Sequence, residues 1–431
     1  MARRPTRLLV ATRHNPFPEN DGAGAYLFDL IEYLSTRGFV TEVAWLHADG
    51  AVKNNSPWRI PAHFQRAARL HIIGGLTLAG KIWFPAEHGH GAKARALNTI
   101  KVSLKSIGLG FLFSAREARK KQPASSSTPT PAPASGSLTK ASWSALPSPA
   151  EHAFFEKRVR AFRPDAILVN YCWLAPLLAG HDALPTAILS CDVVSQRLDR
   201  TPGLDPDPAT PEGEARLLAA ARHILAISED DAAIFRTFLP SRPIIITPKA
   251  AEPRPLPGPT VPDRVLFVGG INDFNREGIL WFLREAWPLI REKNPRALLH
   301  ICGGIGSIVN DVPPGVVIRG RVPDLTAEYA EASAVIVPLL NGSGVKIKLV
   351  EAASYGKAVV TTPIGLQGLG FFRPAVIEAS SATAFADGVS RILADASTQR
   401  TLGENLLQQV IQHLSRDIAY GPVLRALSPT P

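Results

Sequence analysis

The sequence predicts an α/β protein made of two doubly wound, Rossmann-like halves. A buried strand, a glycine-containing loop, an amphipathic helix and a second strand follow one another within 7–46, and the same order starts again at 264. A proline-rich tract, 248–262, separates the halves and holds six prolines in fifteen residues. Strands that alternate with helices are typical of a parallel sheet. We therefore expect two α/β domains with a cleft between them.

The N-terminal half begins with the strand 7–12 (RLLVAT), followed by the loop 13–26, which is rich in turn-forming residues. The next stretch carries apolar residues at helical spacing up to Gly38, and TEVAWL (41–46) has the composition of a strand. Together these form a βαβ unit.

The segment 59–115 is basic and weakly helical, and 100–113 places its apolar residues on one helical face. Of the 29 residues in 122–150, 23 are Ala, Ser, Pro or Thr. We expect a low-complexity, disordered insertion at 116–150. A helix is expected around 151–162.

The remaining elements alternate in the same way. In the N-terminal half, we expect strands at 165–178, 185–192 and 223–228. In the C-terminal half, we expect strands at 264–270, 297–304, 315–322, 332–340 and 357–362, helices at 278–294 and 346–356, and a last helix at roughly 403–427 with a kink at Gly421–Pro422.

These patterns predict a domain plan. We expect residues 1–250 to form a first Rossmann-like domain that holds the insertion, and 251–262 to form a linker. We expect residues 263–413 to form a second Rossmann-like domain, and the helical segment 414–431 to cross back to the first domain.

Composition limits the class of protein. A chain of 431 residues with 45% apolar and 19% charged residues can build two or three cores. Three distant cysteines provide neither a disulfide framework nor clustered metal-ligand spacing. No uncharged apolar run reaches the ~18 residues of a membrane span, and the apolar run behind Arg7 is too short for a signal peptide. We expect a cytoplasmic protein.

The positive charge is concentrated in one segment. Residues 1–163 hold 23 Lys/Arg and 10 Asp/Glu, a balance of +13, whereas the remainder holds 24 and 27, a balance of −3. Residues 59–121 alone hold 12 basic and 2 acidic residues. Such a patch suits an anionic lipid surface, a nucleic acid or another polyanion.

The strongest local signal is LLNGSGVKIKLVEAASYGKAVVTTPIGLQGL (339–369). Gly342 and Gly344 allow close backbone approach to a ligand, and a helix that follows them favours an anion at its N-terminus. Lys346 and Lys348 oppose the helix dipole there, and a bound diphosphate would stabilise both. Glu351 could accept hydrogen bonds from a ribose. The alternative is a solvated helix start in which Lys348 pairs with Glu351.

This segment resembles the nucleotide-sugar-binding signature of retaining GT-B-fold glycosyltransferases, of the large glycosyltransferase family four (glycosyl transferases group 1). Further stretches are similar to family features in the same order: 15–22, 192–197, 226–240, 267–290 and 316–339. The resemblance covers nearly all of 264–370 and patches of 7–46 and 165–247, but not 59–150. It implies a GT-B architecture of two Rossmann-like domains facing a cleft, in which 1–250 bind the acceptor and 263–413 bind the nucleotide sugar.

The resemblance also implies roles for single residues. Glu351 matches the second glutamate of the family's Glu-x7-Glu motif, which holds the donor ribose. Gly344 matches the glycine of the loop that faces the transferred sugar, and Gly342 and Ser343 beside it are further expected donor-binding residues. The other residues to which it gives roles are Lys346, Lys348 and Arg276 at the diphosphate, Gly270 in the first glycine turn, Arg321 and Val322 at the base, and Gly22 and Gly24 in the loop that approaches the phosphates.

Two positions depart from the family pattern. The first glutamate of the motif would fall at Ser343, which puts the positioning of the sugar in doubt. An acceptor-domain histidine is not obvious either, because Cys191 precedes Asp192 where a His-Asp pair is expected. Asp192 is our candidate for a catalytic role.

The implied reaction is glycosyl transfer, with retention, from a nucleoside-diphosphate sugar to a glycan or lipid-linked acceptor in polysaccharide or cell-envelope glycan biosynthesis. Lys346 and Lys348 would stabilise the leaving diphosphate, so that neither a metal nor another cofactor is required. The basic segment 59–121 could lie on an anionic membrane at the inner face of the cell membrane, or it could be a solvated face.

Other candidates are weaker. His88 and His90 resemble a metal-binding snippet but have no third ligand nearby, and Cys191 fits a buried strand thiol better than a nucleophile. Two alternative functions remain. One is a non-catalytic GT-B-like protein that binds an anionic membrane or polyanion through its basic face. The other is a nucleic-acid-binding protein, which the basic patch allows. No nucleic-acid partner is expected, however, because 59–121 lacks regularly interleaved aromatic residues and a recognisable binding module.

Overall fold

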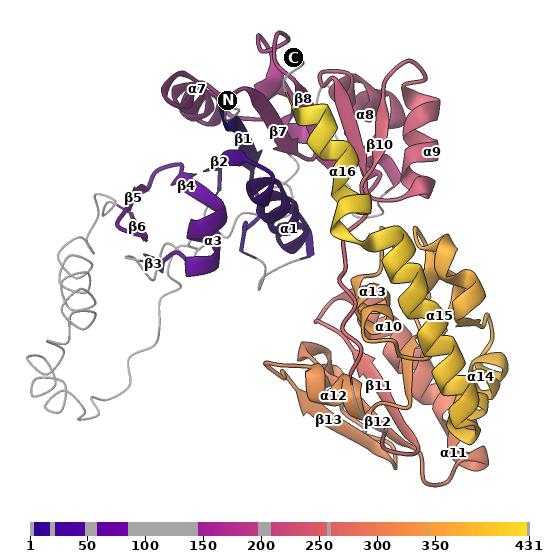
Figure 1. Ribbon diagram of the computed structural model, residues 1–431. Coiled ribbons are helices and arrows are strands. Elements are labelled where there is room, and N and C mark those ends of the chain that lie inside the picture. Colours follow the sequence, from indigo (N-terminus) through magenta and orange to yellow (C-terminus); the bar gives the residue numbers. More distant parts are fainter. Residues whose placement is uncertain are drawn as a thin grey trace, which may run out of the picture. The chain divides into compact units, whose positions relative to one another are not determined.

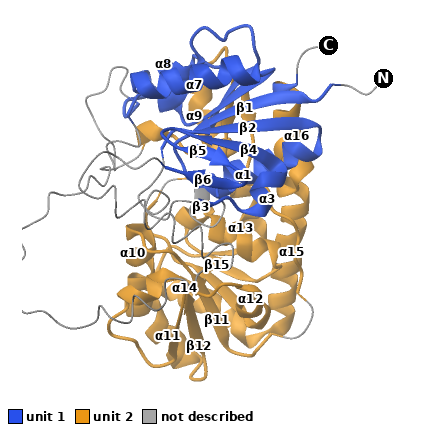
Figure 2. Cartoon of the chain, turned by 90° about the vertical axis from the view of Figure 1, so that its left-hand side faces the viewer, with its two compact units in different colours: residues 1–189, 201–222, 427–431 blue, residues 190–200, 223–426 orange. Residues whose placement is uncertain are grey.

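The computed structural model describes residues 4–17, 22–47, 58–84, 145–196, 208–256, 260–342 and 344–428. The chain divides into two compact units (Figure 2). Unit 1 comprises residues 1–189, 201–222 and 427–431, and unit 2 comprises 190–200 and 223–426. Unit 2 therefore includes two short pieces from the N-terminal half of the sequence as well as nearly all of the C-terminal half.

Unit 1 is built on a parallel sheet (Figure 1). Its strands lie in the order β8-β7-β1-β2-β4, so that the first strand of the chain is central. Three of the predicted elements, at 7–12, 27–34 and 41–46, correspond to β1, α1 and β2, which confirms the βαβ opening. The elements of unit 1 are β1 (Thr6–Thr12), α1 (Gly22–Thr36), β2 (Phe39–Trp45), β3 (Trp58–Arg59), α3 (Ala62–Ala67), β4 (Ala68–Ile72), β5 (Leu76–Leu78), β6 (Lys81–Trp83), α7 (Pro149–Phe162), β7 (Ala166–Asn170), η1 (Cys172–Leu178), β8 (Thr186–Ser190) and α8 (Pro211–Leu218).

The expectation of weak helix was wrong for the described part of the basic segment, 58–84. Only α3 is helical there, and the chain then forms β4 at the edge of the parallel sheet and a separate antiparallel sheet, β3-β6-β5. Buried and more exposed residues alternate along β4, which explains why it is a strand. Ala68, Leu70 and Ile72 are buried, whereas Arg69 is exposed. A period of two favours a strand. The predicted amphipathic stretch 100–113 lies outside the described residues.

The end of the predicted insertion also needs correction. Residues 145–150 are described, and α7 begins at Pro149 rather than after 150. Ser148 accepts a hydrogen bond from the Glu151 N–H, and the Glu151 carboxylate accepts one from the Ser148 N–H in return. This reciprocal capping box satisfies two backbone donors at the helix start. The buried Arg13 guanidinium also donates to both Glu151 carboxylate oxygens, at 2.8 and 3.0 Å.

Unit 2 contains a six-stranded parallel sheet in the order β13-β12-β11-β14-β15-β16. All of the predicted strands of the C-terminal half are present, which confirms the second Rossmann-like pattern. The parallel strands β9 and β10 also belong to this unit, although they continue the strand order of the first sheet next to β8. The elements of unit 2 are η2 (Val194–Gln196), β9 (His223–Ala226), α9 (Glu229–Phe238), β10 (Ile244–Ile246), β11 (Arg264–Val268), α10 (Asp273–Trp281), η3 (Phe282–Ala286), α11 (Trp287–Lys293), β12 (Leu298–Cys302), η4 (Gly304–Ile308), β13 (Val316–Gly320), α12 (Thr326–Glu331), β14 (Ala334–Val337), α13 (Ile347–Ser354), β15 (Val359–Thr361), η5 (Pro363–Leu366), η6 (Gly370–Ala375), β16 (Ile377–Glu378), α14 (Ala382–Ala394), α15 (Ala396–Leu414) and α16 (Arg416–Leu427).

The helix expected at 278–294 is longer and less regular than its pattern suggested. It begins at Asp273, because the Asn272 side chain accepts from the Asn275 N–H at 2.8 Å and caps α10. Its centre, η3, is a π-helical turn in which the Trp287 N–H donates to the Phe282 oxygen, five residues back. Pro288 has no N–H for the α-helical bond in the next turn, which accounts for the widened register.

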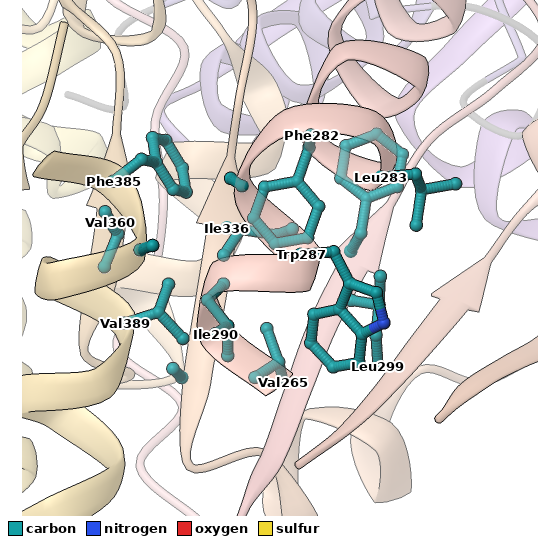
Figure 3. Close-up of a cluster of buried hydrophobic side chains, with 14 of the residues drawn as sticks. Val265, Phe282, Leu283, Trp287, Ile290, Leu299, Ile336, Val360, Phe385 and Val389 are labelled. Carbon is teal, nitrogen blue, oxygen red and sulfur yellow. The ribbon is translucent and has the colours of Figure 1, made fainter. Parts of the chain in front are cut away.

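Aromatic and aliphatic side chains of this helix form one core of unit 2. Phe282, Leu283, Trp287 and Ile290 pack with strand residues and with α14 (Figure 3). Phe282 lies edge-on to Phe385 of α14, with 5.6 Å between ring centroids. A second cluster on unit 2 joins β11, β14, α13 and α15. The sheet is therefore covered by apolar side chains from both sets of helices.

The C-terminal helix breaks at a different place from the one predicted. α15 ends at Leu414, Ser415 adopts extended backbone (ψ 146°), and α16 starts at Arg416. Pro422 lies inside α16, which continues through it. One missing N–H removes one helical hydrogen bond, whereas the extended Ser415 ends the hydrogen-bonding ladder altogether.

Backbone hydrogen bonds fix the described ends of the proline-rich tract within unit 2. The Ala250 N–H donates to the Tyr420 hydroxyl at 3.0 Å, and the Ala251 N–H donates to the Leu414 oxygen at 2.9 Å. The Arg254 N–H donates to the Ser354 oxygen at 2.7 Å, at the end of α13. The tract thus connects the C-terminal helices to the helix that carries the strongest sequence motif.

Candidate active site

The candidate site is built on the loop between β14 and α13. Gly342 and Gly344 adopt φ values of +133° and +67°, in the region that L side chains rarely occupy. A Cβ at Gly344 would lie 3.4 Å from the Cys191 oxygen and 3.7 Å from the Asp192 Cβ. The loop therefore runs close to the 190–192 backbone of the same unit. Ser343, a predicted site residue between the two glycines, lies outside the described residues.

Lys346 is the residue immediately before α13, and it is 7% exposed. Its ammonium donates to the Gly344 oxygen at 2.7 Å and to Gln367 Oε1 at 3.4 Å, so it connects two loops. Burial lowers the pKa of Lys346 to about 8, while Asp231 and Asp192 act in the opposite direction. The ammonium thus lies in a partly desolvated position near two carboxylates.

Lys348 occupies the first turn of α13. Its ammonium donates to Asn275 Oδ1 of α10 and lies 4.6 Å from the centre of the Phe267 ring. Burial and the nearby Lys346 charge lower the pKa of Lys348 to about 7. No carboxylate among the described residues pairs with it. The alternative drawn from the sequence, in which Lys348 pairs with Glu351, is therefore wrong: the lysine has a neutral partner and an aromatic one.

Asn275 connects the lysine to the first glycine turn. Its side-chain amide accepts from Lys348 and donates to the Gly270 oxygen at 2.9 Å. Asn275 is buried, with 6% of its surface exposed. Sequence reasoning missed it, although its position three residues after the Asn272 cap is a visible signal.

Glu351 faces a different set of partners. The Tyr329 hydroxyl donates to its carboxylate at 3.1 Å, and Tyr329 stacks on Tyr355 with 4.5 Å between ring centroids. Burial raises the pKa of Glu351, while the Tyr329 hydrogen bond and the Arg254 charge act in the opposite direction. The carboxylate is thus held by a phenol on α12, a contact that sequence spacing alone could not indicate.

Two further carboxylates lie near Lys346. Asp192 and Asp231 are each 8% exposed. Burial, together with the Asp192 and Asp230 charges, raises the pKa of Asp231 to about 6. Asp231 was not predicted; its only signal is that it lies three residues after Ser228, which caps α9 by accepting from the Asp231 N–H at 3.1 Å.

The loop after η5 closes on the same region. The Gly368 N–H donates to Asp230 Oδ2 at 2.9 Å, and Gly368 has a φ of +72°. A Cβ there would lie 2.9 Å from Val345 Cγ2 and 3.0 Å from Ser228 Cβ. Three stretches distant in sequence, around 192, 230 and 344–368, thus meet within unit 2.

The structure does not bring every predicted residue into this cluster. Arg276 is exposed. Gly270 is exposed as well, and it contacts the cluster through its carbonyl oxygen, which accepts from Asn275. Arg321 is exposed just after β13, whereas Val322 is half-buried against the apolar cluster of unit 2. Gly22 starts α1 and Gly24 is buried within it, both in unit 1.

The glycine stretch 303–307 has a structural explanation. Gly303 adopts a φ of +100°, and a Cβ there would lie 2.2 Å from the Gly269 oxygen. Its N–H donates to the Gly320 oxygen at 2.6 Å. The glycine is required so that the turns after β11 and β12 can pack against each other.

The described residues contain no group of three or more His, Cys, Asp or Glu side chains that could hold a metal ion. No helix in the described part of the chain is long and apolar enough to cross a membrane. The His88 and His90 pair lies outside the part of the chain that the structure describes.

The region that holds these residues is similar in sequence to a known protein family. Residues 262–395 match the sequence model of the family described as glycosyl transferases group 1. The chain carries a glycosyl transferases group 1 domain. This domain contains α10, the 340–346 loop and α13, and therefore Lys346, Lys348 and Glu351.

One curated relative matches a part of this chain. The uncharacterised 44.6 kDa protein in the cps region of Klebsiella pneumoniae is 33% identical over 118 residues. That match covers 25% of this chain and 30% of the relative.

Solved structures match the chain over nearly its whole length. Sucrose-phosphate synthase from Thermosynechococcus elongatus is 16% identical, with a TM-score of 0.62, over 98% of this chain and 99% of that chain. A TarM variant from S. aureus, in complex with fondaparinux, α-GlcNAc-glycerol and UDP, is 9% identical, with a TM-score of 0.65, over 98% and 100%. Anabaena Alr3699/HepE, in complex with UDP and glucose, is 11% identical, with a TM-score of 0.57, over 99% and 100%. The predicted α/β GT-B architecture is thereby confirmed as the fold.

Proposed function

We propose that the protein is a glycosyltransferase that moves a sugar from a nucleoside-diphosphate sugar to a glycan or lipid-linked acceptor. The observation that carries this proposal is Lys348. Its desolvated ammonium is held by a neutral amide and an aromatic ring, beside a second lysine and in the first turn of α13. An anion bound there would favour the charged form of both lysines, and a diphosphate supplies that anion.

The proposed roles follow from these positions. Lys346, Lys348 and the backbone of the 342–346 loop, Ser343 included, would stabilise the charge that develops on the departing diphosphate. Glu351, held by Tyr329, would accept hydrogen bonds from the ribose hydroxyls. Asn275 would fix the direction of the Lys348 ammonium.

In the reaction, the bond from the anomeric carbon to the diphosphate oxygen breaks, and a bond to the acceptor oxygen forms. The acceptor hydroxyl loses its proton, and we propose that the Asp192 carboxylate accepts it. Retention would follow from attack on the face that the diphosphate leaves. We propose that the step needs no metal, because the two lysines supply the positive charge.

Six further residues complete the proposed binding site. Arg276 is proposed as an additional diphosphate cation, and Gly270 as part of the first glycine turn. Arg321 and Val322 are proposed at the base. Gly22 and Gly24, which lie in the first turn of α1 rather than in a loop, are proposed to act at the phosphates.

The biological setting is part of the proposal. The Klebsiella pneumoniae relative is encoded in a cps region, which supports a role in polysaccharide or cell-envelope glycan biosynthesis. The basic segment 59–121 supports a cytoplasmic enzyme at the inner face of the cell membrane. Two structural neighbours contain UDP, so uridine nucleotides are the first donors to test.

The test is thermal unfolding in the presence of a panel of nucleoside diphosphates and nucleotide sugars. A ligand at 100 times its dissociation constant should stabilise the protein by about 2.7 kcal/mol. We expect one base to raise the melting temperature of the wild type, and a much smaller rise for Lys348→Ala and Glu351→Ala. Arg400→Ala, at an exposed position on α15, serves as the matched control. A folded wild type that no nucleotide stabilises would contradict the proposal and favour a non-catalytic binding protein.

A further inference from the structure

The small antiparallel sheet of unit 1, β3-β6-β5, has two unlike faces. Leu76 pairs with Trp83, Leu78 pairs with Lys81, and Lys81 also pairs with Arg59 of β3. Directly paired residues point to the same side of a sheet, and side chains two apart along a strand do so as well. These five residues therefore share one face, which we call the outer face.

The opposite face is fixed against the body of unit 1. Ile82 is completely buried, and Trp58, its partner on β3, contacts Phe17 with 4.6 Å between ring centroids. Thr77, the partner of Ile82 on β5, is half-buried. Because side chains alternate between the two sides of a strand, the outer face points away from this packing.

The outer face is apolar at its most exposed positions. Leu76 is 61% exposed and Leu78 is 62% exposed, and they lie on the same face. Single exposed apolar side chains are common, whereas exposed apolar side chains that lie together mark an interaction surface. Among the described residues of unit 1, they are the two most exposed large hydrophobic side chains. Trp83, half-buried beside them, adds an amphipathic ring of the kind enriched at membrane–water interfaces.

The charge around these leucines has one sign. The sequence 58–84 contains Arg59, Arg66, Arg69 and Lys81 and no aspartate or glutamate. Arg59 and Lys81 lie on the outer face itself, and Arg66 and Arg69 are exposed on the adjoining α3 and β4. Exposed leucines next to an unbroken set of cations suit a surface that offers phosphate groups above an apolar layer.

We propose that the outer face of β3-β6-β5 docks onto an anionic lipid bilayer. The cations would contact the lipid phosphates, while Leu76 and Leu78 enter the boundary between headgroups and acyl chains. A nucleic acid would bind the cations but would leave the two leucines exposed to water. An acidic protein partner would bind in the absence of lipid. The proposal is independent of glycosyl transfer and assigns the membrane contact to one particular sheet face.

Two leucines bury little area, so the attachment is expected to be reversible and to depend on both kinds of contact. Salt should weaken it, because the electrostatic part falls off within a Debye length. Neutral lipid should bind the protein poorly for the same reason.

The experiment is co-sedimentation of the full chain with vesicles of phosphatidylcholine, with or without phosphatidylglycerol. The variants are Leu76→Ser/Leu78→Ser and Arg59→Gln/Lys81→Gln. Their matched controls are Val312→Ser/Ile418→Ser and Arg400→Gln/Arg425→Gln, which change exposed residues of unit 2. Unchanged melting temperatures establish that each variant is folded.

We expect the wild type to bind vesicles that contain phosphatidylglycerol and to dissociate as salt is raised. Each test pair should weaken binding by about tenfold, and each control pair should bind like the wild type. A folded Leu76→Ser/Leu78→Ser variant that binds like the wild type would overturn the proposal, as would equal binding to pure phosphatidylcholine or no binding at all. Binding to RNA as tight as that to vesicles, and unaffected by the leucine changes, would assign the face to a polyanion instead.

Discussion

At the scale of single residues, the candidate site is defined by ionisable groups removed from water. Lys346, Lys348, Asp231 and Glu351 all have pKa values moved by burial toward the neutral form. Groups of this kind destabilise a fold when they are charged, and they cluster where a ligand supplies the missing interaction. The charge states of these groups should therefore affect both the stability of the fold and the binding of a ligand.

The first prediction concerns Asp231. Its pKa is raised to about 6 in the folded protein, so between its unfolded value and 6 the folded state binds more protons than the unfolded state. The free energy of unfolding should therefore fall as pH rises through roughly 4 to 6. Asp231→Asn should remove this slope and stabilise the protein at pH 7 by about 1–2 kcal/mol.

Urea unfolding of the wild type and Asp231→Asn at pH 4.5 and pH 7 measures the effect. Glu229→Gln, at an exposed position in the first turn of α9, is the control. Equal stability of Asp231→Asn and wild type at both pH values would show that the Asp231 carboxyl is not strained by burial.

The second prediction concerns the pH dependence of ligand affinity. Lys348 and Lys346 have pKa values of about 7 and about 8, so both lose charge as pH rises from 7 to 9. A bound diphosphate favours the charged ammonium, and binding should therefore take up protons in this range. The affinity for the stabilising nucleoside diphosphate should fall as pH rises from 7 to 9, where the ligand itself is already fully ionised.

Isothermal titration in two buffers with different ionisation enthalpies measures both the affinity and the proton uptake. Lys348→Ala should bind more weakly and take up fewer protons. An affinity that is constant over this range would contradict the assignment of the lysines to the diphosphate.

At the scale of elements, glycines set how closely α10 approaches the sheet. A Cβ at Gly278 would lie 2.4 Å from the Pro338 oxygen, just after β14. This approach brings Asn275 of α10 within reach of Lys348 of α13. The position of one helix therefore decides the partner of a site lysine.

The third prediction tests that approach. Gly278→Ala would gain some helix propensity but force α10 away from Pro338, and overpacking of this kind costs about 1–3 kcal/mol. We expect a net loss of stability together with weaker nucleotide binding. Gly270→Ala is the control for stability, because its Cβ would meet nothing within 4 Å. Chemical denaturation of both variants gives the comparison, and an unaffected Gly278→Ala would show that α10 is free to shift.

At the scale of the whole molecule, the two units have separate tasks in our proposals. The donor residues belong to unit 2, and the proposed membrane face belongs to unit 1. The net charge of +13 in residues 1–163 against −3 in the remainder agrees with this division.

The fourth prediction is a pattern of hydrogen exchange over the chain. A saturating nucleoside diphosphate should slow exchange in 269–276, 340–351 and 362–369, which meet around the two lysines. Exchange in β3, β5 and β6 should stay unchanged. Vesicles that contain phosphatidylglycerol should give the reverse pattern. Mass spectrometry of peptic fragments reads both, and protection by nucleotide that is confined to unit 1 would contradict the assignment of the donor site.

Local sequence patterns predict most of the strands, two of the helices and the central motif. Most strands of the two parallel sheets follow from apolar runs, although β4, β10 and β16 were not predicted, and the two helices α1 and α13 follow from helical spacing and glycine stops. Lys346, Lys348 and Glu351 could be selected because their motif is continuous in sequence. Expectations based on weak signals did worse. The segment 58–84 contains four strands and one short helix where helix was expected, α7 starts earlier than expected, and the last helix breaks at Ser415 rather than at Pro422.

The sequence by itself therefore determined the α/β class, the element order and the motif that bears the two lysines, because each of these depends on neighbours along the chain. Only the tertiary structure decided what surrounds that motif. Asn275, Tyr329 and Asp231 come from α10, α12 and α9, and they reach the site through packing of elements up to more than a hundred residues apart. Burial, which shifts the pKa values of the lysines, and strand register, which gathers Leu76, Leu78 and Arg59 on one face, are likewise properties of the folded chain.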